Sequence, residues 1–219
     1  MDLEKGFEVT HYDEVEFGDK AKKNCDNKIV GEIIDWIETV VAALISVVII
    51  FSLFFRLATI VGPSMQNTLY DGERIIISNF FYKPKYGDIV VVSRNTNNSV
   101  ETVQSSREPI IKRVIATEGQ YVDIDFETGK VYVGADLSNM VELIEPYAKE
   151  PTNLKYDVEF PVYVKKGHVF VLGDNRNNST DSRSSSIGDS GLIDERYILG
   201  KAVYRVWPLD SIGGFEDYE

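Results

Sequence analysis

A serine and a lysine are the residues of this sequence whose types and surroundings best suit joint chemistry. Ser64 lies in the run Gly62-Pro63-Ser64-Met65, where Gly62 lets the backbone approach a ligand closely and Pro63 restricts the turn. The expected result is a serine hydroxyl held at an exposed turn. Taken alone, a serine after a proline marks a turn and nothing more.

Lys112 lies inside the apolar run Ile110–Ala116. A lysine that points inward from such a strand is desolvated, which disfavours its charged form and lowers its pKa. A neutral amine within hydrogen-bond reach of a serine hydroxyl can take the proton of that hydroxyl and make it a nucleophile. Arg113 should point to the opposite face and keep its charge in solvent. The structural alternative is that Lys112 extends its amine along the strand to water.

The sequence offers few residues for a histidine-dependent catalytic site or a phosphate-binding site. The two histidines, His11 and His168, lie in the N-terminal stretch and at the start of a β-prone run, so neither a Ser-His-Asp triad nor a zinc site is expected. No Gly-rich phosphate-binding motif occurs. The single cysteine, Cys25, cannot form an intramolecular disulfide, and its polar surroundings do not suggest catalysis.

Composition excludes further classes of ligand. The formal net charge of −12 argues against a nucleic-acid binder, which needs a clustered basic face. Asp174–Asp181 begins like a calcium loop, but Ser179 and Ser185 replace the glycine and glutamate of its sixth and twelfth positions. We therefore expect no metal and no organic cofactor.

The run from Thr39 to Phe55 contains no charged residue. If it forms a helix that spans a membrane, it holds Ser64 and Lys112 near that membrane. With its apolar flanks it is roughly 25 residues, or about 37 Å long, enough for a bilayer core of ~30 Å. A buried core helix would need a partner surface on every side. A cleaved leader would need a positive n-region and a small-x-small site, which are missing. The sequence therefore predicts a polar, acidic tail over residues 1–33 and a transmembrane anchor over residues 34–60.

Basic residues near the anchor predict its orientation. Four lysines, Lys20, Lys22, Lys23 and Lys28, lie just before the apolar run, whereas Arg56 and Arg74 are the first positive residues after it. Acidic residues count little in the positive-inside rule. The bias places the N-terminus in the cytoplasm and residues 61–219 on the extracytoplasmic face of the cell membrane.

From Val61 onward the sequence changes to short β-prone runs separated by turn residues. About 155 residues can bury a self-sufficient core. The predicted fold is mainly β: one N-terminal transmembrane helix followed by a compact, largely antiparallel β domain. The polar loops Asn95–Arg107 and Leu137–Leu154 are expected to be mobile. The expected strands include Arg74–Ser78, Ile89–Ser93, Ile110–Ile115, Lys130–Val133, His168–Leu172 and Ala202–Val206.

Four stretches follow one another along the chain as a set. They are Gly62-Pro63-Ser64-Met65, Tyr86–Val91, Ile111–Ala116 and Gly173–Arg183. In order and spacing they resemble the boxes of bacterial type I signal peptidases, particularly the small, single-span kind typical of Gram-positive bacteria. The likeness covers residues 36 to about 214, and the fourth stretch is its most specific part. The first 30 residues are not covered.

The resemblance implies roles for individual residues. Ser64 would be the nucleophile, Lys112 the general base, and Ser179 a hydrogen-bond partner that orients the lysine amine. Gly62, Pro63 and Met65 would form the nucleophile turn. Some members carry a serine two residues before the nucleophile as an oxyanion donor, whereas this chain has Gly62 there, so the Ser64 backbone N–H would be the main donor. The ion pair Asp181–Arg183 would hold the strand of Ser179, and Asp174 and Arg176 would stabilise the same region.

The resemblance also implies a function: cleavage of N-terminal signal peptides from exported preproteins through an acyl-enzyme. The expected partners are those signal peptides, the lipid bilayer and the secretion translocon. Three alternatives stay open. The first is a self-cleaving Ser-Lys repressor, which the predicted anchor argues against. The second is an anchored protein that binds leader peptides without cutting them. The third is a peptidase with the same chemistry that is dedicated to one substrate.

Overall fold

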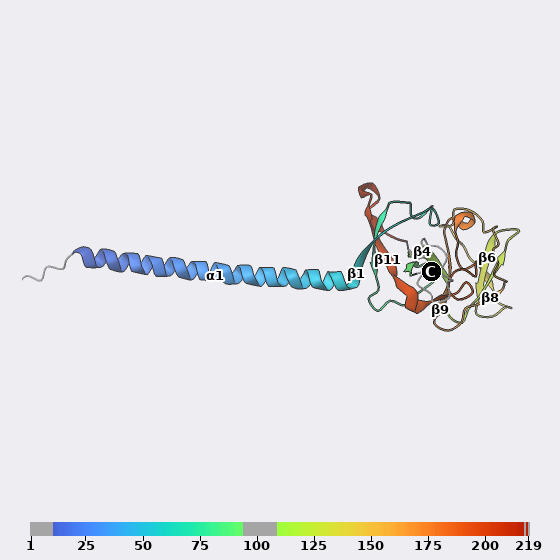
Figure 1. Cartoon of the computed structure of the whole chain (residues 1–219), viewed down its shortest axis with the longest axis horizontal. Coiled ribbons are helices and arrows are strands. Elements are labelled where there is room, and N and C mark those ends of the chain that lie inside the picture. The colour runs from blue at the N-terminus through green and yellow to red at the C-terminus, as the bar shows by residue number, and fades with distance from the viewer. Residues whose placement is uncertain (1–10, 94–108, 217, 219) are drawn as a thin grey trace, which may run out of the picture. The chain divides into compact units, whose positions relative to one another are not determined.

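The computed structural model describes residues 11–93, 109–216 and 218, with side chains from residue 30 onward. The chain divides into two units, Met1–Leu53 and Phe54–Glu219. The first contains most of the helix α1, which runs from His11 to Phe54 (Figure 1). Its segment Val30–Phe54 is long and apolar enough to cross a membrane, and none of it is buried. The Ser46 and Ser52 hydroxyls donate to helix carbonyls four residues back, at 2.8 and 2.7 Å.

The helix ends at Phe54, whereas the predicted anchor extends to residue 60. Phe55–Thr59 forms the strand β1, which pairs antiparallel with Ser78–Arg74 of β2. Apolar residues serve a helix in a membrane and a strand in a sheet equally well, so composition does not mark this change. The helix also reaches back to His11, into the stretch predicted as a tail. The domain boundaries themselves stay a prediction.

A curled antiparallel sheet carries most of the second unit. Its order is β1-β2-β11-β3-β4-β9-β10, with β12 paired to β11. The long strand β11, coloured orange-red in Figure 1, therefore lies between β2 and β3 although it comes from the C-terminal part of the chain. The strands are β1 Phe55–Thr59, β2 Arg74–Ser78, β3 Ile89–Val92, β4 Ile110–Ala116, β9 His168–Leu172, β10 Ile193–Asp194, β11 Ile198–Trp207 and β12 Gly213–Gly214.

A smaller sheet of order β7-β6-β5-β8 completes the unit. Short 3-10 helices connect the strands of the larger sheet. The smaller sheet's strands are β5 Tyr121–Asp125, β6 Lys130–Gly134, β7 Val141–Glu142 and β8 Val162–Tyr163, and the short helices are η2 Arg176–Asn178, η3 Glu195–Tyr197 and η4 Leu209–Ser211.

The core lies on both faces of the larger sheet. All four residues of β3 are buried, and they alternate between two clusters: Ile89 and Val91 pack with Met65 and Ile77, whereas Val90 and Val92 pack with other strands. An uninterrupted Ile-Val run is what a strand covered on both faces requires. A third cluster, which includes Ile115, Val133 and Phe170, joins β4 and β9 to the smaller sheet.

The predicted fold class, mainly antiparallel β after one apolar helix, is confirmed. Of the two loops expected to be mobile, Asn95–Arg107 lies outside the described residues. The other, Leu137–Leu154, contains β7 and buries Tyr147 and Thr152. Part of the loop Leu137–Leu154 is therefore ordered and packed against the rest of the domain.

Candidate active site

Ser64 lies in a tight turn directly after β1. The backbone N–H of Gly62 donates to the Asp71 carboxylate at 2.8 Å, and Gly62 has φ +87°, which favours glycine. On the other side of the serine, the Leu69 N–H donates to the Met65 carbonyl at 2.8 Å, and the Met65 side chain is buried beneath the turn. The turn thus has support before and after Ser64.

Asn175 anchors the same turn from the loop after β9. Its backbone N–H donates to the Ser64 carbonyl at 3.0 Å, and its side-chain amide donates to the Pro63 carbonyl at 3.0 Å. This residue lies within the most specific of the stretches singled out in the sequence, but no pattern in that stretch predicts its contact with the turn. The turn that carries Ser64 is therefore tied to the loop that carries Ser179.

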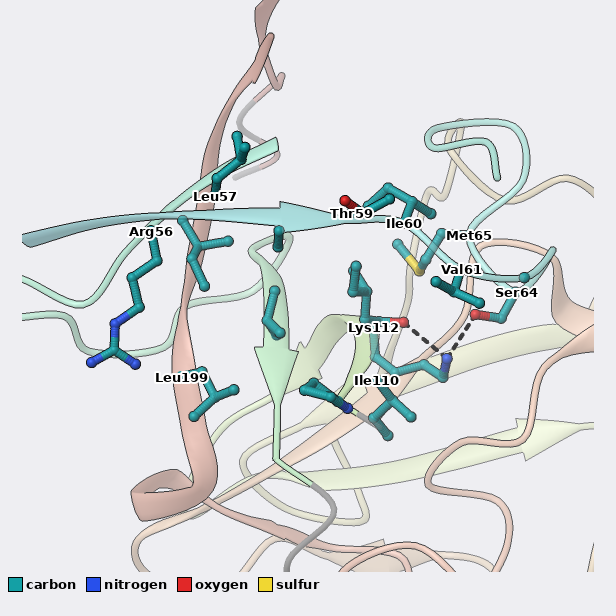
Figure 2. A pocket seen from close by; sticks show the side chains of 16 residues that line it. Arg56, Leu57, Thr59, Ile60, Val61, Ser64, Met65, Ile110, Lys112 and Leu199 are labelled. Carbon is teal, nitrogen blue, oxygen red and sulfur yellow. Dashed lines mark hydrogen bonds between the residues drawn. The ribbon is translucent and has the colours of Figure 1, made fainter. Parts of the chain in front are cut away.

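Lys112 reaches Ser64 from β4. Its Nζ lies 2.8 Å from Ser64 Oγ and 2.9 Å from the Ile111 carbonyl oxygen, as Figure 2 shows. Lys112 is 3% exposed. This confirms the expectation that the lysine points inward and excludes the alternative that its amine extends along the strand to water. An amine at this distance is placed to exchange a proton with the serine hydroxyl.

Gly173 brings the serine of the fourth stretch against the nucleophile turn. A Cβ atom at position 173 would overlap both the Ser179 side chain and the Ser64 carbonyl oxygen. Ser179 is buried, but its Oγ makes no hydrogen bond within the described chain. The hydrogen bond expected between Ser179 and Lys112 is thus absent from this structure, although the residue lies in the expected neighbourhood.

Arg113 corrects a sequence expectation, because it does not point to solvent. It is 1% exposed, and its guanidinium forms a two-point ion pair with Asp174, with Nε 2.9 Å from Oδ1 and Nη2 2.7 Å from Oδ2. Its Cζ also lies 4.0 Å from the Tyr147 ring centroid. The alternation of β4 does turn Arg113 away from Lys112, but that second face is covered by loops and not by water. The partner of Asp174 is therefore Arg113.

Arg176 and Arg183 hold the loop after β9 from within. The Arg176 guanidinium donates two bonds of 2.7 Å to Glu145, a residue of the loop predicted to be mobile. Burial alone would lower the pKa of Arg176, but the hydrogen bonds and charge of Glu145 raise it, so the guanidinium stays charged. The expected Asp181–Arg183 ion pair is present and fully buried, with Nε 2.8 Å from Oδ1.

A cavity of about 480 Å³ opens beside the serine and the lysine. Residues of β1 and the start of β4 form its opposite sides, and Figure 2 shows Leu57, Leu199 and Ile110 around it. Most of the lining is apolar, with Lys112 and Ser64 at one end. A mostly apolar cavity with a few polar groups at one end is typical of a ligand-binding site.

Two further properties concern what the site can bind. Within the described part of the chain, the Ser64 backbone N–H donates no hydrogen bond, so it is available to a developing oxyanion. No three His, Cys, Asp or Glu side chains converge to hold a metal ion among the described residues.

Comparison with known proteins gives the family. The model of signal peptidase, peptidase S26, matches residues 33–207. The chain belongs to this family. It is 33% identical over 221 residues to thylakoidal processing peptidase 1, chloroplastic, of Arabidopsis thaliana, a match that covers 96% of this chain and 59% of that protein. It is 30% identical to signal peptidase I P of Bacillus subtilis subsp. natto, over 89% of this chain and 97% of that one.

The chain therefore spans little more than half the length of the chloroplast relative and nearly all of the bacterial one. It is also similar to a crystal structure of a signal peptidase I from Enterococcus faecalis, at 23% identity and a TM-score of 0.40, over 56% of this chain and 98% of that chain.

Within this peptidase S26 chain, sequence reasoning missed three supports of the site: Arg113, Asn175 and Glu145. Arg113 adjoins Lys112 in β4, and alternation alone assigned it to solvent. Glu145 lies in a polar loop with no periodic pattern. Asn175 could have been suspected from its place beside Asp174 in the fourth stretch. In the structure Asn175 binds the Pro63 carbonyl, and Asp174 accepts a hydrogen bond from Thr68.

Proposed function

We propose that this chain is a membrane-anchored serine endopeptidase that cleaves N-terminal signal peptides from exported preproteins, with Ser64 as nucleophile and Lys112 as general base. The observation that carries the proposal is the 2.8 Å contact between Lys112 Nζ and Ser64 Oγ in a buried setting. Membership of the signal peptidase family and the naming of a 30% identical relative as a signal peptidase I support the substrate class.

The reaction follows from the positions of the two groups. Neutral Lys112 takes the Ser64 proton while Oγ attacks the scissile carbonyl carbon, and the carbonyl π electrons move to the oxygen. Collapse of this tetrahedral intermediate breaks the C–N bond, and Lys112 returns the proton to the leaving amine. Water then attacks the acyl-enzyme, with Lys112 again as the base, and releases the carboxylate and the free serine. The two steps together consume one water.

The developing oxyanion needs a donor that is not already occupied. The Ser64 backbone N–H meets this requirement, whereas Gly62 supplies no side chain and its own N–H is bound to Asp71. We infer that the backbone of Ser64 is the main donor. Gly62, Pro63 and Met65 then act by fixing the turn from which that N–H points.

Ser179 acts on the lysine in this scheme as a positioning residue. Its Oγ makes no hydrogen bond to any described residue, so it is available to accept from or donate to the Lys112 amine once Ser64 is acylated and its oxygen no longer binds the lysine. Arg113–Asp174, Arg176–Glu145 and Asp181–Arg183 hold the loop that carries it.

The apolar segment Val30–Phe54 is the anchor of this enzyme in the lipid bilayer. The lysines that precede it support an orientation with the N-terminus in the cytoplasm and residues 61–219, with the catalytic site, on the extracytoplasmic face. Signal peptides carry their own apolar helix in the same membrane, so confinement to one plane raises the effective concentration of enzyme and substrate. The secretion translocon, which delivers those substrates, is a further expected partner.

Cleavage of a purified precursor tests the proposal. The full chain in detergent should release a mature protein whose new N-terminus, read by mass spectrometry, follows a small residue. Ser64→Ala and Lys112→Ala should each abolish release, and the double variant should be no worse than either, because the two residues act as a unit. An unaltered chain that binds the precursor but leaves it intact would support the non-cutting alternative and overturn the assignment.

A further inference from the structure

The turn that carries Ser64 continues beyond Met65. Consecutive turns run to Thr68, whose backbone N–H donates to the Met65 carbonyl at 3.0 Å, and Leu69 donates to the same carbonyl at 2.8 Å. The Thr68 peptide is therefore one hydrogen bond away from the residue that follows the nucleophile. A group that holds Thr68 also acts on the turn that aims Ser64.

Thr68 is held from two sides. Its hydroxyl donates to Asp174 Oδ2 at 2.5 Å and accepts from Arg113 Nη2 at 3.3 Å. Its backbone carbonyl accepts a hydrogen bond of 2.5 Å from Nη2 of Arg205. The first contact ties the turn to the Arg113–Asp174 pair described above. The second ties it to β11, which comes from the other end of the domain sequence (Figure 1).

The guanidinium of Arg205 is directed at the turn more than at its ionic partner. Its Nε lies 3.2 Å from Glu73 Oε2, but neither of these two atoms makes a hydrogen bond within the described chain. An arginine that served a carboxylate alone would present two N–H groups to it, as Arg113 does to Asp174. Glu73 thus balances the charge of Arg205, whereas the Thr68 carbonyl sets the direction of its Nη2.

The strand around Arg205 is irregular on both sides. The pairing of β11 with β2 shifts register between Ala202 and Tyr204, and again between Arg205 and Trp207. Such bulges re-aim side chains and are common beside active sites. The Phe215 ring centroid lies 5.7 Å from the Arg205 Cζ atom, and the arginine side chain is 18% exposed. The guanidinium therefore has few other orientations open to it.

We propose that Arg205 is a positioning residue for the cleavage reaction, because it holds the Thr68 carbonyl and with it the aim of Ser64. The proposal rests on the role of Ser64 as nucleophile given above. Neither Arg205 nor Thr68 belongs to the described lining of the cavity beside Ser64. Replacing Arg205 should therefore slow the chemical step and leave the affinity for the precursor nearly unchanged. A purely structural role would change stability alone.

Single-turnover cleavage of a precursor by the full chain in detergent measures these effects. The maximal rate and the half-saturating enzyme concentration are obtained for each variant, at a temperature where circular dichroism shows it to be folded. Arg205→Met should lower the maximal rate by about thirtyfold or more and change the half-saturating concentration by less than about twofold. Arg205→Lys keeps a charged donor and should recover part of that loss.

Two matched variants separate positioning from packing. Arg196→Met removes an exposed arginine whose guanidinium binds Asp194, and it should behave as the unaltered chain does. Glu73→Gln removes the ionic partner of Arg205 but leaves the Thr68 carbonyl in place. Glu73→Gln and Arg205→Met should both lower the urea midpoint, because each breaks the same pair. Only Arg205→Met should show the large loss of maximal rate.

The outcomes distinguish this proposal from the proposed function. A folded Arg205→Met chain with an unchanged maximal rate would overturn the positioning role and leave the Ser64 assignment standing. Equal losses of rate in Arg205→Met and Glu73→Gln would also overturn it, because the ion pair would then be the source of the effect. If Arg205→Met does not fold, Arg205→Lys decides, since one amine cannot reproduce both contacts. An unchanged rate in that variant would refute the role.

Discussion

At the scale of single residues, proton transfer from Ser64 depends on the charge of Lys112. The amine is a base only after it has lost its own proton, so the rate should rise with pH towards an alkaline optimum. Lys112→Arg should be inactive at every pH, with a loss of at least about a thousandfold, because a guanidinium stays protonated. Single-turnover rates from pH 5 to 10 check both points. A profile that is flat from pH 5 to 9, with chemistry rate-limiting, would contradict the lysine base.

Ser179 separates a positioning role from a packing role. Among the residues that the structure describes, its buried Oγ has no hydrogen-bond partner to lose, so Ser179→Ala should change the free energy of unfolding by no more than about 0.5 kcal/mol. If the hydroxyl aims the lysine amine during turnover, the rate should fall by roughly one to three decades. Urea unfolding and single-turnover cleavage measure the two effects. An unchanged rate would remove Ser179 from the mechanism.

Gly173 offers a steric test of the same neighbourhood. A methyl group at this position would overlap the Ser179 side chain and the Ser64 carbonyl, so Gly173→Ala should push the nucleophile turn out of place. We expect a rate at least about a hundredfold lower and a stability loss of about 1–3 kcal/mol. Gly213→Ala is the matched control, because a Cβ at Gly213 meets nothing within 4 Å. Equal activity of the two variants would show that the turn adapts.

At the scale of elements, the buried pair Arg113–Asp174 joins β4 to the loop after β9. Arg113→Met or Asp174→Leu alone leaves an unpaired buried charge and should cost about 3–5 kcal/mol of stability. The double variant should lose less than the sum of the two, and urea denaturation of all four proteins measures the coupling. Lys130→Gln, which breaks an exposed pair with Glu142, should leave the midpoint unchanged. Strict additivity of the two core variants would refute the coupling.

Elements with a regular pattern were predictable from the sequence. The strands Arg74–Ser78 and His168–Leu172 have the predicted bounds, since short apolar runs bounded by turn residues allow few other readings. β1 was missed because Phe55–Thr59 continues the apolar composition of the helix without a break. The first half of β11 was missed because Gly200 and Lys201 interrupt its apolar run.

The site was predictable only where a residue's own chemistry marked it. Ser64 and Lys112 stand out as a proline-turn serine and a lysine in an apolar strand, and the structure places them in contact. The partners of Arg113 and Arg176 did not stand out, because they come from loops far along the chain. Polar loops have no period from which a contact can be inferred, so Glu145 was assigned to a mobile segment when it binds Arg176.

At the scale of the whole molecule, the direction of insertion is the main prediction. In sealed inside-out membrane vesicles, a tag at the N-terminus should be digested by added protease, whereas an epitope at the Glu127 turn should be protected. Right-side-out vesicles should give the reverse. The reason is the group of four lysines before the apolar segment. Protection of the tag in inside-out vesicles would reverse the proposed topology.

The position of β11 in the larger sheet has a consequence for biosynthesis. Between β1, which leads to Ser64, and β4, which carries Lys112, stand β2, β11 and β3, and β11 is drawn from Ile198–Trp207. A nascent chain that has emerged from the ribosome only as far as residue 190 has both reacting side chains but lacks the strand that bridges their halves of the sheet. Translation must therefore pass Trp207 before the first turnover. Recovery of cleavage activity during refolding would, for the same reason, report complete insertion of β11.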